Sequence, residues 1–273
     1  MRVKHLVTFS GGIGSWAAAK RVVERQGKDG VALLFADTLY EDPDLYRFID
    51  EAAENVGVPL FRVCDGRTPW QVFHDVRFLG NSRVDPCSKH LKRDILDRWR
   101  NEHCDPAETT IYLGIDWSEK HRLTRVQSRV APWRYEAPMC DRPCLTKAGM
   151  IHWLESEGIR PPRLYTLGFP HNNCGGFCIK AGQSQFRLLL DRLPDVYERN
   201  EQQEESIREL LGDVSVMRSR VGGESKPITM QQFRQRIQME PNLFADDDWG
   251  GCGCAIDDNE PECEIEKAVA NHE

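Results

Sequence analysis

The sequence predicts an α/β protein in which an open, mainly parallel sheet carries helices on both faces and a smaller helical C-terminal region follows. Three observations lead to this class. Short apolar runs alternate with helical sequence over the first 140 residues. A glycine-rich turn at residues 10–15 joins the first apolar run to Ala-rich helical sequence. Beyond Thr146 the pattern changes to helices and loops, so the sheet is expected to end before that point.

The strands are expected where apolar residues run without interruption. They lie at residues 4–9, 31–36, 60–63 and 110–115, with a closing strand near 134–137. Uninterrupted Val, Leu, Ile and Phe are typical of parallel strands that are covered on both faces. The helices between the strands are expected at residues 15–26, 43–56, 70–79 and 88–102.

The C-terminal half is expected to be helical. Helical sequence occurs at residues 147–157, 184–192, 195–211 and 229–238, and no clear strand is predicted there. We therefore divide the chain into an α/β domain at residues 1–140, a helical cysteine-bearing region at 141–245 and an acidic tail at 246–273.

Composition limits the class of protein. The net charge of −7 is dominated by the tail, where ten acids stand against one lysine; removing that −9 leaves the rest of the chain at +2. Anionic substrates are therefore compatible with the body of the protein. No signal peptide is expected, and the longest apolar run is too short for a bilayer. We expect a cytoplasmic protein that does not enter a membrane.

Ten cysteines without a secretory signal predict metal or redox chemistry, because the cytosol keeps thiols reduced. Cys64 and Cys104 lie in an apolar stretch and after a helical run, and are expected to be incidental thiols. The remaining cysteines are the candidates for chemistry.

The turn Ser10-Gly11-Gly12-Ile13-Gly14-Ser15 predicts a phosphate site. Backbone N–H groups of such a turn and of the following helix attract anions where no bulky side chain intervenes. The alternative is a tight strand-to-helix turn that only needs glycine. The turn is neither a Walker A loop nor a dinucleotide fingerprint, because Gly-Lys-Ser/Thr and Gly-x-Gly-x-x-Gly are both absent.

Two further segments follow predicted strands and are expected at the same edge of the sheet. Asp37 follows the second strand, and Gly114 opens the stretch Gly114-Ile115-Asp116 after the fourth. Ligands of open parallel sheets bind at this edge, where the strand order reverses. Arg122, on a helix expected to begin near Ser118, is placed to neutralise phosphate or sulfate.

Several segments, taken in order, carry a family resemblance. They are the turn at 10–15, Asp37-Thr38, Pro86-Cys87-Ser88-Lys89-His90-Leu91-Lys92, the stretch at 114–122, Ala137-Pro138-Met139, and Leu164-Tyr165-Thr166-Leu167-Gly168-Phe169-Pro170 with Cys174 after it. Together they resemble the adenine nucleotide alpha hydrolase-like (PP-loop) superfamily, which includes ATP pyrophosphatases and phosphoadenylylsulfate (PAPS) reductases. The resemblance covers about residues 4–190 and implies a HUP/PP-loop type sheet that binds ATP, PAPS or adenylyl sulfate (APS), with magnesium as a further candidate.

The resemblance departs from the family at two positions. Gly14 stands where ATP pyrophosphatases usually carry Asp, and Asp116 stands where the family usually has Arg. Because of these differences, the resemblance does not imply that ATP is cleaved.

The cysteines of Cys174-Gly-Gly-Phe-Cys178 surround two glycines, which lets a backbone wrap a metal centre. By the resemblance, Cys87 lies in the segment that faces this pair. We expect Cys87, Cys174 and Cys178 to hold an iron–sulfur cluster of the 4Fe-4S type; zinc and a plain glycine turn with unrelated thiols are the alternatives. The fourth ligand is left open, with Cys140 and Cys144 among the candidates.

Cys252-Gly-Cys254 resembles in placement the C-terminal Glu-Cys-Gly of PAPS reductases, whose cysteine attacks sulfur. We expect Cys252 and Cys254 to act as nucleophile or resolving thiol, with a cluster ligand as the alternative.

Three functions are compatible with these expectations. They are a sulfonucleotide reductase-like enzyme, an ATP-dependent adenylating sulfurtransferase that thiolates a nucleobase or similar group, and a nucleotide-binding protein without chemistry. A sulfur or electron donor protein and a nucleic-acid substrate are candidate partners; the oligomeric state is left open.

Overall fold

Five parallel strands form the central sheet of the computed structural model, which describes residues 2–81, 84–129, 131–221 and 224–240. The strands are β1 His5–Thr8, β2 Val31–Asp37, β3 Leu60–Cys64, β4 Thr110–Tyr112 and β5 Arg134–Glu136. Their order is β3-β2-β1-β4-β5, with every neighbouring pair parallel. The predicted open parallel sheet is thus confirmed. The order reverses between β1 and β4, which creates a crevice at their carboxyl ends.

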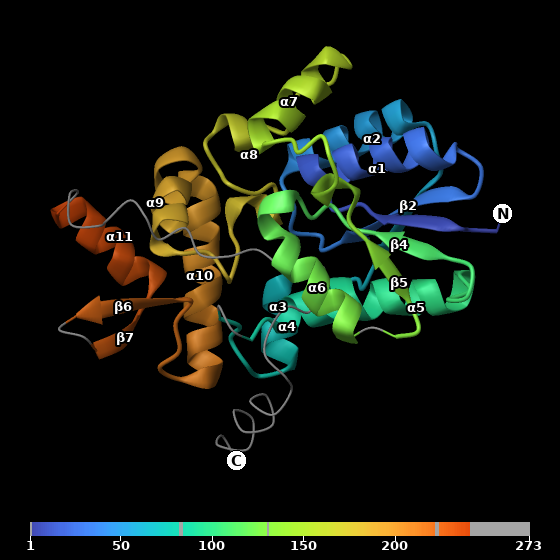
Figure 1. The fold of residues 1–273 in the computed structure, drawn as a ribbon. Helices are drawn as coiled ribbons and strands as arrows, with labels where there is room; N and C mark the ends of the chain where they lie inside the picture. Colours follow the sequence, from blue (N-terminus) through green and yellow to red (C-terminus); the bar gives the residue numbers. More distant parts are fainter. Residues whose placement is uncertain (1, 82–83, 130, 222–223, 241–273) are drawn as a thin grey trace.

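Helices cover both faces of this sheet, as Figure 1 shows. One face packs against α1 Ile13–Gln26, α2 Pro43–Val56 and α7 Lys147–Ser156, and the other against α5 Asp94–His103 and α6 Lys120–Arg129. Alternate strand residues supply the two faces. Val7 and Leu33 lie in the core under α1, whereas Leu6 and Leu34 lie in the core under α5. This alternation explains why the strands are apolar throughout.

A second core lies beside the sheet and is built mainly by the C-terminal region. Its helices are α9 Gln183–Arg192, α10 Pro194–Leu211 and α11 Met230–Met239, and the short α8 Arg163–Thr166 contributes Leu164. The helix α3 Pro69–Asp75, which precedes β4 in sequence, also packs here through Trp70 and Phe73. The division at residue 140 stays a prediction, while the packing places α7 with the first core and α3 with the second.

The expectation of no strand beyond residue 146 is wrong. Strands β6 Met217–Val221 and β7 Glu224–Ile228 form an antiparallel pair. In the sequence, Pro227 argues against a strand at this position. Both strands of a two-stranded ribbon are edge strands, however, and an edge strand tolerates proline. Buried Glu204 of α10 accepts hydrogen bonds from Val216 N (2.7 Å) and Met230 N (2.5 Å), which fixes the hairpin between α10 and α11.

Across the described residues, no helix is both long and apolar enough to cross a membrane.

Candidate functional site

The turn after β1 and the end of β4 meet at the crevice through their backbones. A Cβ atom on Gly14 would lie 2.6 Å from the Gly114 carbonyl oxygen, and a Cβ on Gly114 would lie 2.6 Å from Ser15 N. Both distances are far below van der Waals contact, so each position accepts only hydrogen. The two glycines that the sequence marks are therefore required for this close approach.

The turn also presents the amino end of α1 to the crevice. Gly11 has a left-handed φ of 75°, and its carbonyl accepts a 2.9 Å hydrogen bond from Asn172 Nδ2. Gly12 is the N-cap and, being glycine, supplies no side-chain cap; the first turn of α1 carries no acid. Ser15 Oγ donates to Gly12 O over 2.8 Å. An uncapped helix start with oriented N–H groups favours an anion.

A pocket opens over this turn. Six of the predicted nucleotide-binding residues line it, namely Ser10, Gly12, Gly14, Ser15, Gly114 and Arg122. As far as the described residues define the lining, Gly11 and Asp37 are not part of it. The Asp37 carboxylate instead accepts hydrogen bonds from Leu39 N (2.8 Å) and Tyr46 Oη (2.9 Å). The structure thus brings most of the predicted set together and directs Asp37 to a local turn.

Basic side chains that were not among the predicted nucleotide-binding residues also line this larger pocket. They are Lys92, Lys147 and His171. Arg122 reaches the same wall and pairs with Glu119 at 2.7 Å. No local motif marks Lys147 or His171, whereas Lys92 belongs to the quoted Cys-x-x-x-Leu-Lys segment. The pocket therefore collects cationic groups around the amino end of α1.

Lys147 is a half-buried member of this group. Its ammonium group lies 4.1 Å from the centre of the Tyr165 ring and donates to Pro170 O. Burial lowers the pKa of Lys147 to about 8, because desolvation disfavours the charged form. The Tyr165 hydroxyl in turn accepts a 3.2 Å hydrogen bond from Ile13 N, the first residue of α1. Lys147 is thus a cation at the anion-attracting turn that titrates near neutral pH.

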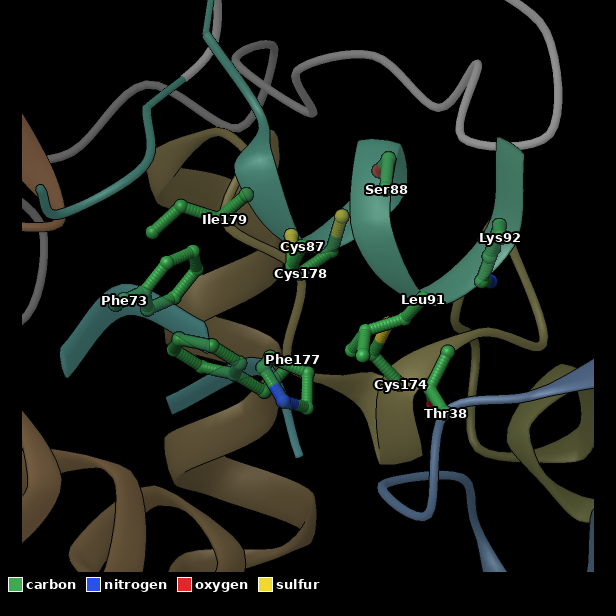
Figure 2. A pocket seen from close by; sticks show the side chains of 11 residues that line it. Thr38, Phe73, Cys87, Ser88, Leu91, Lys92, Cys174, Phe177, Cys178 and Ile179 are labelled. Atoms are coloured by element: carbon green, nitrogen blue, oxygen red, sulfur yellow. The ribbon is translucent and has the colours of Figure 1, made fainter. Parts of the chain in front are cut away.

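The three predicted metal-ligating cysteines line a second, smaller pocket. Phe73, Leu91, Phe177 and Ile179 supply most of its apolar walls. In Figure 2, Cys87 and Cys178 lie close together, and Cys174 lies apart from them beside Leu91. We call this the thiol pocket. Within the residues that the structure describes, no group of three His, Cys, Asp or Glu side chains is arranged to hold a single metal ion.

The Cys87 segment is positioned by a buried carboxylate. Cys87 lies in α4 Pro86–Ser88, which continues through a π-helical turn, Lys89–Arg93, into α5. Such turns are frequent at functional sites. Asp85, whose side chain is 2% exposed, pairs with Arg93 at 3.1 Å and with Lys180 at 3.3 Å. Because Lys180 follows Cys178 by two residues, Asp85 ties the Cys87 and Cys178 segments together.

The other cysteines lie elsewhere. Cys140 donates from its thiol to Asp116 O at 3.3 Å, and Cys144 is exposed; neither is among the described lining of the thiol pocket. Cys64 and Cys104 carry free thiols, Cys64 exposed and Cys104 half-buried. Cys252 and Cys254 fall outside the described residues, so their assignment as nucleophile or resolving thiol stays a prediction.

The two pockets are neighbours. Lys92 lines both, and the consecutive residues Asn173 and Cys174 line the larger pocket and the thiol pocket respectively. Groups bound in the two pockets would therefore lie next to each other, with an ammonium group between them.

Comparisons with solved structures find proteins of similar fold. No protein-family model matches the chain, and no curated protein matches it. Among solved structures, the chain is similar to phosphoadenylyl-sulfate (PAPS) reductase from Candida auris, determined as a phosphate complex. The likeness covers 61% of this chain and 78% of that protein, with 14% sequence identity and a TM-score of 0.43. The α/β assignment itself rests on the strand order and register described above.

Proposed function

We propose that the protein binds an adenine nucleotide in the larger pocket and carries out thiol-dependent sulfur chemistry on it, in the manner of a sulfonucleotide reductase. The observation that carries the proposal is the junction of the two pockets at Lys92. A phosphosulfate group held at the amino end of α1 would lie beside the thiol pocket. Sulfur chemistry needs this proximity, because reaction rates depend on holding the reacting groups in contact.

The anion end of the nucleotide is assigned to the turn at residues 10–15. The uncapped start of α1 and the cations Lys92, Arg122 and Lys147 suit phosphate or sulfate oxygens. The adenine class of the nucleotide comes from the PP-loop resemblance of the turn.

An iron–sulfur cluster is proposed in the thiol pocket, with Cys87, Cys174 and Cys178 as ligands. Zn–S bonds of about 2.3 Å place the sulfurs of a tetrahedral zinc site about 3.8 Å apart. The described residues offer no such close group, although all three thiols line one apolar cavity. In a cluster the thiolates bind different irons, so the three cysteines need not converge on one metal ion. When bound, the cluster supplies a redox-active, sulfide-bearing centre beside the anion site.

The chain's own thiols would carry the reaction. A thiolate, proposed as Cys252 or Cys254, attacks the sulfur of the phosphosulfate. The S–O bond of the S–O–P bridge breaks, the nucleotide leaves with the electron pair, and the sulfonate group stays on the cysteine sulfur. A second thiol then attacks the cysteine sulfur, so that sulfite is released and a disulfide forms. A dithiol donor protein would reduce that disulfide and close the cycle.

The Gly14 contact supports this reading over the ATP-cleaving alternative. ATP pyrophosphatases usually carry Asp at this position of the turn, and here any side chain would collide with the Gly114 carbonyl at 2.6 Å. The turn therefore has no room for a carboxylate at position 14, where ATP pyrophosphatases usually carry their Asp.

The proposal is tested on protein purified without oxygen. Brown protein that contains iron and sulfide in near-equal amounts, and sulfite release from PAPS or APS, are the expected results. Cys87→Ser, Cys174→Ser and Cys178→Ser should each lose the iron, because a missing thiolate opens an iron to solvent, whereas Cys64→Ser should keep it. Colourless protein that exchanges labelled pyrophosphate into ATP in the presence of magnesium would instead establish the adenylating sulfurtransferase.

A further inference from the structure

Glu41 is a buried carboxylate whose position no sequence motif marks. It follows β2, and its side chain is 2% exposed. One oxygen, Oε1, accepts a 3.0 Å hydrogen bond from Thr38 Oγ1 and lies 3.6 Å from Lys92 Nζ. The other, Oε2, accepts a 2.5 Å hydrogen bond from Cys174 N. One carboxylate therefore contacts the β2 loop, the π-helical segment and the cysteine turn.

The backbone that receives this hydrogen bond is unusual. Cys174, Gly175 and Gly176 have successive left-handed φ values of 50°, 60° and 88°. Glycine adopts this conformation without penalty, but for a residue with a Cβ it costs about 1 kcal/mol or more. Such a conformation persists where surrounding contacts hold it. At Cys174, the contact on the backbone N–H is the Glu41 carboxylate.

We propose that Glu41 is a positioning residue that holds Cys174 in its left-handed conformation and so directs the Cys174 thiol into the thiol pocket. The inference rests on the proposed function only where it treats the Cys174 thiol as a cluster ligand. The positioning of Cys174 by Glu41 is a property of the metal-free chain. Gly175 supports the same arrangement, because a Cβ there would lie 3.4 Å from Tyr40 O. The cysteine turn is thus packed directly on the loop that carries Glu41.

A carboxylate suits this role better than an amide. Its two oxygens accept from Cys174 N and Thr38 Oγ1 while its charge is paired with Lys92. An amide can still accept from Cys174 N through its oxygen, but its NH2 group would then face the Lys92 ammonium. Glu41→Gln therefore preserves the contact to Cys174 and loses the ion pair, whereas Glu41→Ala loses both.

The first measurement is the alkylation rate of each cysteine in metal-free, fully reduced protein, followed by mass spectrometry with limiting N-ethylmaleimide. In Glu41→Ala, Cys174 should react about tenfold faster, since a lost charge-assisted hydrogen bond of about 1.5 kcal/mol makes local opening that much more frequent. Cys87 should change by less than about twofold, because its segment is tied by Asp85 instead. Glu41→Gln should fall close to the wild-type rate.

Glu51→Gln is the matched control. Glu51 lies on α2 and pairs with Arg47 at 2.6 Å, but its side chain is 45% exposed and remote from the cysteine turn. This variant should leave every cysteine rate unchanged. The second measurement is iron bound per chain after anaerobic reconstitution, which Glu41→Ala should lower while Glu51→Gln retains it.

An unchanged Cys174 rate in folded Glu41→Ala would overturn the inference. If Glu41→Ala does not fold, Glu41→Asp decides, because it keeps the charge but is one methylene too short for Cys174 N: an unchanged Cys174 alkylation rate in this variant would overturn the inference. Wild-type protein that takes up no iron would contradict the proposed function, and the alkylation comparison would still test Glu41.

Discussion

The two pockets are built in different ways, although they share Lys92. The larger pocket includes the backbone at the ends of β1 and β4, where Gly14 and Gly114 touch. The thiol pocket is formed by side chains from segments far apart in sequence, joined by the buried carboxylates Asp85 and Glu41. The larger pocket should therefore be disrupted by atoms added at its glycines. The thiol pocket should be disrupted by removal of a buried charge.

The largest effect is expected from removing the charge of Asp85. Asp85→Asn leaves Arg93 and Lys180 without their carboxylate in a buried site, and breaking a buried ion pair costs about 3–5 kcal/mol. Chemical denaturation should show this loss in the free energy of unfolding. Asp75→Asn is the matched control, because Asp75 is 51% exposed and pairs with Arg67 on the surface, where the cost is about 1 kcal/mol or less. Equal losses of unfolding free energy in the two variants would contradict a stabilising role for the buried ion pairs of Asp85.

A methyl group at Gly14 should damage the larger pocket. In Gly14→Ala the Cβ collides with the Gly114 carbonyl, and forced repacking of this kind costs about 1–3 kcal/mol. Calorimetry should show that nucleotide binding is lost, since the first turn of α1 must move away from Gly114. Gly149→Ala in α7 is the control: its nearest neighbour would be Thr146 Oγ1 at 3.5 Å, so it should stabilise the helix slightly. Undiminished binding by Gly14→Ala would refute the backbone contact.

A smaller effect is expected in the pH dependence of nucleotide affinity, which tests the larger pocket alone. The pKa of Lys147 is lowered to about 8 by burial, so this lysine loses its positive charge as pH rises through 8. Affinity for PAPS should fall above that pH by up to about tenfold, the value of one charge-assisted hydrogen bond. Lys147→Arg stays charged and should give a flat profile between pH 7 and 9. Parallel profiles would mean that Lys147 does not contact the ligand.

The same burial makes a prediction for stability. The folded pKa of Lys147 lies below its ordinary value of 10.5, so the unfolded chain binds more protons between about pH 8 and 10.5. The contribution of Lys147 to the free energy of unfolding should therefore rise with pH across that window. Replacing Lys147 with Met should remove this rise in thermal or denaturant unfolding.

The sequence was sufficient for the parts of the molecule that depend on local pattern. The parallel strands and the turn at residues 10–15 follow from apolar runs and glycine spacing, and the strand-end rule placed Gly114 correctly against that turn. The same rule also selected Asp37, whose carboxylate is used by Tyr46 and Leu39 N, because a position at the correct edge does not fix where a side chain turns.

The parts that were missed depend on packing between distant segments. Lys147 reaches the larger pocket only because α7 packs on α1, and Glu41 meets Cys174 across 133 residues of sequence. The hairpin of β6 and β7 was missed because Pro227 argues against a strand wherever the neighbouring strands are unknown. Periodicity carries no information about such partners.

The position of α3 has a consequence for synthesis of the chain. Trp70 and Phe73 leave the ribosome before β4 and β5, which complete the central sheet, yet they belong to the core that α9, α10 and α11 build. A nascent chain therefore carries an uncovered aromatic surface until nearly all of it has been translated. Surfaces of this kind attract chaperones and promote aggregation. The yield of protein in a cell should thus depend on how quickly translation passes from α3 to α11.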